Sequence, residues 1–600
     1  MTYLKTVTEQ ITIAHALLGL ILLAAGLMRL ANLGNSPLSP AEAEAALAVW
    51  QFWQAGEATI MPTSPAYFLL TLLITPLLGF SDATVRLIPA LAGLGLVALP
   101  WLLRRQIGTV AALTGSLLLA ISPLATITAR TAGGDALALL ALMLLVVGLV
   151  RYSETENVGW LYPIGLGLGL GLTSASLFYT GLLALAFAAA LARLVEPQPA
   201  DEPDASQENN DKNLRSSAFI RVPSIFALLA FLGLGSGFLL YLPGLGQSTQ
   251  LLAAWLGQFN LSGSLESLFV PLMALARYEL PLIVLGLVAM LWLIWQERPL
   301  ASYATYWLMG LLVLLLLQRG ELSNVPVLIV PGYLLVSTLV GSVVSDRYSV
   351  FSDRYGVNGR FLTLVTGGMF LLGLIVVVQM ARFTRAVAVN PEDLLHLWIA
   401  VLALAFALVT FFYFWGLEAE TTVQGSLIAL LLLFGLFQWG TAWWLGHHAA
   451  NDPRERWVTQ ATQPNTPQLA ALIGDISYQI DRSPSGIRIY SMVDNPALQW
   501  YLREFDALTI GSPVLPETPY PLVISPADME PTFRSDYFGA DFLLMYDGSE
   551  ATIIGDLPLL TGLRWWLFRS GPPAPTTLPD RPDQIERVTL WVQSDLLVEQ

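Results

Sequence analysis

Long apolar segments with few charged residues recur along most of this chain, from Ile11 to Leu445. A run of about 20 such residues is the length that crosses a bilayer as a helix. Taken in order, the segments predict about thirteen crossings, since a helix satisfies its own backbone hydrogen bonds inside lipid. The predicted fold class is a polytopic α-helical membrane protein, with a transmembrane domain over residues 1–446.

Composition supports this class and excludes several kinds of function. Of the 600 residues, 55% are hydrophobic and 12% are charged, whereas an ordinary soluble protein carries about 25% charged residues. The net charge of −15 argues against nucleic acid as a partner. The chain has no cysteine, which excludes disulfides, thiolate metal sites and cysteine nucleophiles.

Basic residues predict how the chain is oriented, because Lys and Arg concentrate in cytoplasmic loops. Arg104, Arg105 and the loop that carries Arg347, Arg354 and Arg360 are therefore expected to be cytoplasmic. The segment Pro65–Phe80 is short for a crossing, so we place it at the interface. The expected outer loops are then 34–86, 125–135 and 243–279. We expect a multi-pass protein of the plasma membrane.

Two polar regions interrupt the apolar pattern. Residues 196–217 are rich in acids, amides and proline, which predicts a disordered cytoplasmic linker. Residues 451–600 form an acidic tail, which an odd number of crossings would place outside the cell. Alternating patterns predict an α/β domain there, without a phosphate loop. We interpret it as a structural or acceptor-facing module. Its expected helices are Gln468–Ile480 and Pro496–Glu504, and its expected strands are Ile487–Tyr490, Leu522–Ile524, Phe542–Met545 and Arg564–Phe568.

The segment Leu33–Tyr67 is a polar, acidic loop between apolar segments, and it is the first place to look for chemistry. Pro40, Glu42 and Glu44 begin a helix-like run within it. Carboxylates in the first turn of a helix can simply complement its positive end. They can also act as acid and base in an enzyme that works at the membrane surface. The sequence leaves both interpretations open.

Four stretches, in order, resemble the GT-C superfamily of polytopic glycosyltransferases that use lipid-phosphate sugars. This superfamily includes protein O-mannosyltransferases and aminoarabinose transferases. The stretches are PLSPAEAEAAL (37–47), SPAYFLLTLLITPLLGFSDATVRLIPALAG (64–93), ISPLATITARTAGGDALALLAL (121–142) and QRGELSNVPVLIVPGYLL (318–335). In the tail, NPALQWYLREF (495–505) and LRWWLFR (563–569) resemble a bacterial and archaeal branch sometimes labelled flippase-associated.

The resemblance implies a GT-C fold and transfer of a sugar from a polyprenyl-phosphate donor to an acceptor hydroxyl on a lipid, glycan or protein. It implies Glu42 as the general base, Glu44 as the second candidate, and Asp135 as a residue that orients the acceptor or shares a divalent cation. Arg130, Arg319 and Arg86 are the candidates for binding the donor phosphate, because Arg binds phosphate bidentately. The metal requirement is left open.

Two departures from the family pattern weaken the expectation of catalysis. The family's Asp beside Glu42 is Ala41 here, and its Lys or His ahead of the second stretch is Thr63. A catalytically silent relative that handles lipid or forms a membrane complex is therefore the alternative. Among the site residues, Asp135 could be a plain helix N-cap, and the arginines could be anchors at lipid headgroups.

Overall fold

The computed structural model describes residues 12–596, apart from 59, 196–205, 260–264, 295–298, 319–320, 346–356, 391, 453–454, 456, 512–518 and 548–584. Within this part of the chain, nine helical segments are long and apolar enough to cross a membrane. Two further pairs of helices, each bent at a short break, raise the number to eleven. The chain is thus a polytopic helical membrane protein, as predicted.

The nine segments are built from one or several consecutive helices. They are α2 (Ile13–Leu30), the run α5 (Asp82–Val85), α6 (Leu87–Ala98), η1 (Leu99–Leu103) and α7 (Arg104–Ile107), then α10 (Asp135–Thr155), α12 (Ser176–Val195), α17 (Pro299–Leu317), η3 (Leu322–Leu328) with α18 (Ile329–Ser345), α19 (Val357–Val389), α20 (Leu395–Leu417) and α21 (Ala419–His447). The two bent pairs are α8 (Thr109–Ile121) with α9 (Pro123–Arg130), and α15 (Leu265–Tyr278) with α16 (Leu280–Ile294).

The remaining helices of this region are shorter or partly polar. They are α3 (Pro40–Ala55), α4 (Pro65–Leu78), η2 (Val158–Trp160), α11 (Leu161–Leu172), α13 (Ser206–Gly235) and α14 (Pro243–Gly257). The two expected crossings that are missing from the eleven correspond to α11 and to the apolar half of α13, which are too short to count as full spans. This difference explains why the sequence suggested about thirteen.

The structure differs from the predicted disordered linker in its second half. Residues 196–205 lie outside the described residues, but α13 begins at Ser206 and runs without a break into its apolar half. Residues 206–217 are therefore helical, since Gln, Glu, Lys and Leu are good helix formers and the apolar half extends the same helix. The cytoplasmic position of this segment stays a prediction.

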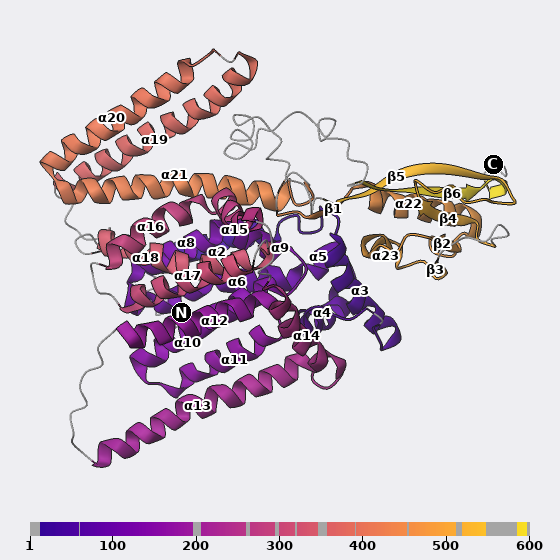
Figure 1. Ribbon diagram of the computed structural model, residues 1–600, viewed down its shortest axis with the longest axis horizontal. Helices are drawn as coiled ribbons and strands as arrows, with labels where there is room; N and C mark the ends of the chain where they lie inside the picture. Colours follow the sequence, from indigo (N-terminus) through magenta and orange to yellow (C-terminus); the bar gives the residue numbers. More distant parts are fainter. Residues whose placement is uncertain are drawn as a thin grey trace, which may run out of the picture.

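The helices form an elongated bundle with the tail at one end (Figure 1). The helices α3, α4, α5 and α14 lie at the end that faces the tail, whereas the start of α13 lies at the other end. The side chain of Gln106 donates to the carbonyl of Val150, late in α10, whereas Asp135 begins that helix. A helix of 21 residues is about 30 Å long at 1.5 Å per residue. Arg104 and Arg105 therefore lie at the end away from Asp135.

Glu279 connects the two broken spans inside the bundle. It is fully buried between α15 and α16, which meet at 98°. One carboxylate oxygen accepts from the hydroxyl of Ser122 (2.5 Å) and from the backbone N–H of Leu124 (3.0 Å), at the start of α9. The other accepts from Tyr333 and from Gln438 (2.6 Å). Four donors thus satisfy a carboxylate whose burial would otherwise be costly.

The described tail is a mixed six-stranded sheet with helices against it, in agreement with the predicted α/β class. The strand order is β1-β5-β6-β4-β2-β3; β2 runs parallel to β3 and β4, and the other neighbours are antiparallel. The elements are β1 (Gln460–Thr462), α22 (Asn465–Asp481), β2 (Ile489–Ser491), α23 (Pro496–Leu502), β3 (Leu508–Ile510), β4 (Leu522–Pro526), β5 (Tyr537–Asp547), β6 (Ile585–Gln593) and η6 (Ser594–Leu596). The predicted strand Arg564–Phe568 lies outside the described residues.

Helix α23 docks the tail onto the bundle, close to α3 and α5. The indole N–H of Trp500 and the hydroxyl of Tyr501 donate to the two carboxylate oxygens of Asp82, at 2.8 and 2.7 Å. Tyr501 also accepts from the N–H of Leu38 (2.9 Å), and Arg503 donates to the carbonyl of Phe80 (2.8 Å). Of the two tail stretches with a family resemblance, residues 495–505 therefore form a docking segment, whereas residues 563–569 lie outside the described residues.

Candidate active site

The first acidic helix, α3, begins where the sequence signals predict. Ser39 is its N-cap, Pro40 occupies the first turn, and Glu42 completes a capping box with Ser39. The N–H of Glu42 donates to the Ser39 hydroxyl (3.4 Å), and the N–H of Ser39 donates back to the Glu42 carboxylate (3.0 Å). Caps of this kind stabilise a helix by about 1 kcal/mol.

Glu42 also forms a buried, bidentate ion pair with Arg86. The Nε and Nη2 atoms of Arg86 each lie 2.8 Å from one carboxylate oxygen of Glu42. The backbone N–H of Ala132 donates to the same carboxylate at 2.8 Å. Glu42, Arg86 and Ala132 belong to three different stretches that resemble GT-C proteins. The hydrogen bonds of the Glu42 carboxylate therefore hold these three stretches together.

These contacts determine the protonation of Glu42. Burial disfavours its charged form, but the Arg86 charge and the hydrogen bonds from Arg86, Ala132 and Ser39 outweigh burial and lower the pKa of Glu42. A carboxylate that is ionised, 4% exposed and engaged by four donors is poorly placed to take a proton from a substrate. The prediction that Glu42 is the base stays untested, and the geometry favours a positioning role.

Arg86 is held equally firmly. Its Nη1 atom donates to the carbonyls of Leu33 (3.1 Å) and Ser36 (2.8 Å), and Nη2 donates to the carbonyl of Pro37 (3.2 Å). The loop that precedes α3 therefore wraps around this guanidinium. Arg86 is buried in protein, so the geometry does not favour the headgroup-anchor interpretation.

Arg130 holds two helix ends together. Its guanidinium donates to the carbonyl of Gly446, near the end of α21, at 2.8 Å. It also donates to four carbonyls at the end of α2, namely those of Met28, Arg29, Ala31 and Asn32, at 2.8 to 3.2 Å. The C-terminus of a helix carries about half a negative charge, so two such ends offset much of the charge of Arg130.

Asp135 is a carboxylate without a committed partner. Gly134 occupies the N-cap position of α10, and Asp135 is the first helical residue and does not cap the helix with its side chain. A side chain at position 134 would collide with the Ser174 carbonyl, at 1.9 Å. The N-cap interpretation of Asp135 is therefore not realised. Asp135 is partly exposed, and within the described residues it makes no hydrogen bond or ion pair.

Glu321 is a carboxylate that the sequence analysis did not select, and it lies near enough to Asp135 to repel it electrostatically. Its Oε1 accepts from the N–H and hydroxyl of Ser323. Next to it, Asn324 is fully buried and donates to Gln258 and Gln318, while its Oδ1 accepts nothing among the described residues. The signal available in the sequence was an acid two positions after Arg319, within the stretch 318–335 that resembles GT-C proteins.

The residues around Asp135 give limited support to a bound divalent cation, which the sequence left open. Asp135, Glu321 and the Oδ1 of Asn324 are oxygen ligands of the type that hard cations prefer. Across the described residues, however, no group of three His, Cys, Asp or Glu is arranged to hold a metal ion. We therefore derive no chemical step that requires a metal.

Four other positions that the sequence singled out remain, of which the structure describes three. Glu44 is partly exposed, and no hydrogen bond or ion pair engages its side chain in the described part of the chain. Ala41 and Thr63, where the family pattern has Asp and Lys or His, are both exposed. Arg319 lies outside the described residues, so its predicted role stays a prediction.

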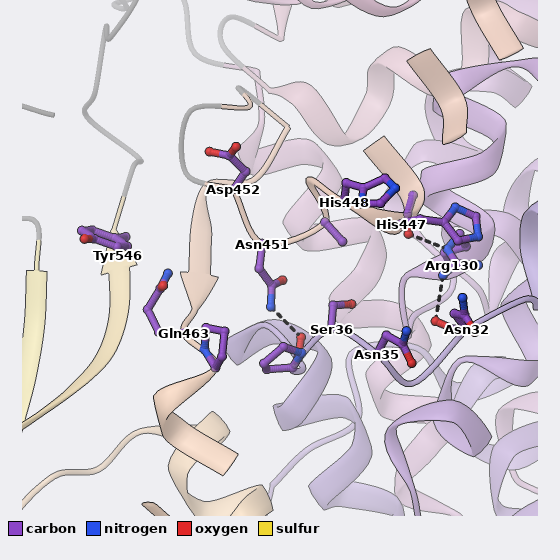
Figure 2. Close-up of a pocket in the computed structure, with 14 residues that line it drawn as sticks. Asn32, Asn35, Ser36, Arg130, His447, His448, Asn451, Asp452, Gln463 and Tyr546 are labelled. Carbon is purple, nitrogen blue, oxygen red and sulfur yellow. Dashed lines mark hydrogen bonds between the residues drawn. The ribbon is translucent and has the colours of Figure 1, made fainter. Parts of the chain in front are cut away.

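Two adjoining cavities lie where the bundle meets the tail. The smaller, of about 100 Å³, is lined by Glu42, Arg86, Thr131 and Trp457 among others. The larger, of about 360 Å³, is drawn in Figure 2 and is lined by polar residues from both parts. Arg130, Ser36 and Asn451 line both cavities. Neither cavity has Asp135 in its lining.

Comparison with known proteins points to one superfamily. Residues 62–197 match the family model of the dolichyl-phosphate-mannose-protein mannosyltransferases. No curated protein sequence matches the chain. The structure is similar to ArnT from Cupriavidus metallidurans bound to undecaprenyl phosphate, with a TM-score of 0.50, 16% identity, and coverage of 86% of this chain and 93% of ArnT.

Two other crystal structures are also similar. Apo ArnT from Cupriavidus metallidurans has a TM-score of 0.48 at 16% identity, covering 84% of this chain and 86% of that one. The apo oligosaccharyltransferase of Archaeoglobus fulgidus has a TM-score of 0.42 at 12% identity, covering 84% and 65%. The family match and the likeness to undecaprenyl-phosphate-bound ArnT confirm the predicted resemblance: this chain has the fold of the polytopic GT-C membrane glycosyltransferases.

Proposed function

We propose that the chain is a glycosyltransferase that moves a sugar from a polyprenyl phosphate to an acceptor hydroxyl at the outer face of the plasma membrane. The observation that carries the proposal is Asp135, a carboxylate at the end of the bundle that holds the tail; it makes no hydrogen bond or ion pair with any described residue and lies within electrostatic range of Glu321. It lies inside the segment that matches a mannosyltransferase family. The undecaprenyl phosphate bound to ArnT supports a polyprenyl-phosphate donor.

The reaction requires one base and one site for the leaving phosphate. The acceptor oxygen forms a bond to the anomeric carbon, the bond from that carbon to the phosphate oxygen breaks, and polyprenyl phosphate leaves with the electron pair. Asp135 takes the proton of the acceptor hydroxyl, a contribution of typically 10²–10⁴-fold. Glu44 is the second candidate for the base.

A cation is needed where negative charge develops on the leaving phosphate. Arg86 and Arg130 already donate to a carboxylate and to several carbonyls. Arg319 is therefore our first choice for the phosphate, because it stands two positions from Glu321 in the sequence. Glu42 and Arg86 act as positioning residues that hold the loops before α3, α6 and α10 together.

The proposal is tested by mass spectrometry of polyprenyl-linked sugars and surface glycans in a deletion strain. Deletion should cause a polyprenyl-phosphate sugar to accumulate and one sugar to disappear from a glycan, lipid or protein. The wild-type chain should restore the normal pattern, and the Asp135→Asn variant should not. Unchanged lipids and glycans after deletion would refute the function, and full restoration by Asp135→Asn would refute the role of Asp135.

A second candidate function keeps the GT-C fold without catalysis. It is favoured by the exposed Ala41, which stands where the family pattern has an acid, and by the mutual neutralisation of Glu42 and Arg86. Such a protein would hold polyprenyl-linked lipids or join a membrane complex. This second function predicts that deletion leaves all lipid-linked sugars and surface glycans unchanged. It also predicts that the Asp135→Asn variant corrects any other defect of the deletion strain as fully as the wild-type chain does.

A further inference from the structure

The larger cavity between bundle and tail is a pocket lined by side chains from both parts of the chain, and the fold alone does not indicate its ligand. Its floor comes from the α2–α3 loop and the end of α21, and its far side comes from the tail (Figure 2). Gln463 and Tyr546 of the tail lie opposite Asn32 and Asn35 of the loop. Because the pocket adjoins the smaller cavity lined by Glu42 and Arg86, a ligand there would lie next to the loops of the candidate active site.

Charge in this pocket is largely cancelled. Among the described residues of the lining, Arg130 is the one arginine. Its five hydrogen bonds to described residues all go to carbonyls at the ends of α2 and α21. Two helix C-termini supply roughly one negative charge between them. The carboxylate of Asp452 also belongs to the lining. A phosphate or another anion would therefore gain little from this pocket.

The groups that remain available are neutral donors and acceptors. Within the described residues, the side-chain amides of Asn32 and Asn35 and the hydroxyl of Tyr546 make no hydrogen bond. Asn451 uses only its nitrogen, which donates to the carbonyls of Pro37 and Thr462. Each amide offers a donor and an acceptor side by side, the pattern that matches two adjacent hydroxyls of a sugar ring. Tyr546 adds a flat apolar face with a polar tip.

We propose that this pocket binds a neutral sugar unit of the acceptor glycan. The inference rests on the proposed glycosyl transfer and assigns its acceptor class. The volume of about 360 Å³ is at the small end of ligand pockets, which span roughly 300–1,000 Å³, and suits one or two rings. The tail then contributes one side of the acceptor site. This role accounts for the contacts that hold the sheet domain on the bundle, namely the hydrogen bonds from α23 to Asp82 and the ion pair between Arg277 and Glu455.

Binding can be measured without transfer, by saturation-transfer difference NMR on the full chain in lipid nanodiscs. The probes are the methyl glycosides of mannose, glucose, galactose and N-acetylglucosamine, with glucose 1-phosphate and inorganic phosphate as anionic probes. We expect at least one neutral glycoside to bind more tightly than either anion. Absence of binding by all four, or tighter binding of an anion, would overturn the proposal.

The site is located by substitution. Tyr546→Ala and Asn35→Ala should each weaken glycoside binding about tenfold or more, which corresponds to 1.4 kcal/mol. Tyr478→Ala is the matched control, because Tyr478 is 55% exposed on α22 and does not line the pocket. Asn35 is in an exposed loop, so its variant remains informative if Tyr546→Ala unfolds. Equal binding by Asn35→Ala, Tyr478→Ala and the wild type would overturn the assignment.

Failure of this inference can be told from failure of the proposed function. Asp135 is outside the pocket lining, so Asp135→Asn should bind the glycoside as well as the wild type while losing transfer in the deletion strain. A chain that transfers sugar but binds none of the glycosides refutes the pocket alone. A chain that binds a glycoside but leaves all lipid-linked sugars unchanged refutes the transferase.

Discussion

The substitution Glu42→Gln should destabilise the chain strongly, although it preserves side-chain shape. The carboxylate accepts from Arg86 twice, from Ala132 and from Ser39. The glutamine amide keeps one acceptor oxygen, but its N–H groups would face the N–H donors of Arg86, Ala132 or Ser39. Arg86, which is only 3% exposed, would then be a buried charge without its carboxylate partner. Removing one partner of a buried ion pair typically costs about 3–5 kcal/mol.

The assay is thermal unfolding of the purified protein in nanodiscs, followed by the fluorescence of its 18 tryptophans. For domains of 150–250 residues, 1 kcal/mol corresponds to about 2–4 °C, and a larger cooperative unit shifts less. We therefore expect Glu42→Gln to lower the midpoint by several degrees. Glu44→Gln is the matched control on the same helix, and it should stay within about 0.5 kcal/mol of the wild type.

The same pair predicts a difference in acid stability. The pKa of Glu42 is lower in the folded chain than in the unfolded chain, where it is about 4.3. The folded state therefore binds fewer protons, so the stability from Glu42 is fully present above pH 4.3 and is lost as pH falls through the folded pKa. Acid should destabilise the wild type more steeply than Glu42→Gln. Equal midpoints and equal acid profiles for the Glu42→Gln and Glu44→Gln variants would refute the positioning role.

Three further predictions address the base, the docking of the tail and the orientation. Asp135→Asn should lower transfer at least about 10²-fold and leave the unfolding midpoint near that of the wild type, because Asp135 makes no hydrogen bond or ion pair within the described part of the chain; a large fall in midpoint would contradict this. Tyr501→Phe removes a 2.7 Å hydrogen bond to Asp82, worth about 1.5–3 kcal/mol for a charged partner. Limited proteolysis between bundle and tail should therefore accelerate relative to Tyr478→Phe, and equal rates would refute the docking contact. In this cysteine-free chain, Thr63→Cys in intact cells should react with an impermeant thiol reagent and Arg105→Cys should not; the reverse pattern would invert the topology.

The membrane part of the fold was largely predictable because long apolar segments have few alternative structures. The predicted number of crossings differed only at α11 and at the apolar half of α13, because both apolar segments are too short to count as full spans. The tail was harder. Strand β6 could have been found from the alternation of Val588, Leu590 and Val592, which are all buried. In contrast, β1 and β3 are three residues each, too short to show a period.

The site was less predictable because its decisive contacts join distant positions. Sequence marked Glu42 and Arg86 as candidates, but it could not show that each satisfies the other across 44 positions. The sequence likewise predicted Arg130 as a phosphate ligand, but in the structure its guanidinium donates to backbone carbonyls at the ends of α2 and α21. The placement of Glu321 beside Asp135 depends on the path of α17 and η3 through the bundle, which no local pattern encodes.

The most direct test of the account is the release of free polyprenyl phosphate by the purified chain. Lipid-linked sugars extracted from the deletion strain serve as donor, and the wild-type and Asp135→Asn chains are compared in nanodiscs by mass spectrometry. The account predicts that the wild-type chain releases polyprenyl phosphate in the presence of acceptor glycan and that Asp135→Asn does not. The account would be contradicted if both chains released polyprenyl phosphate equally. It would also be contradicted if neither chain released polyprenyl phosphate from any of the extracted lipids.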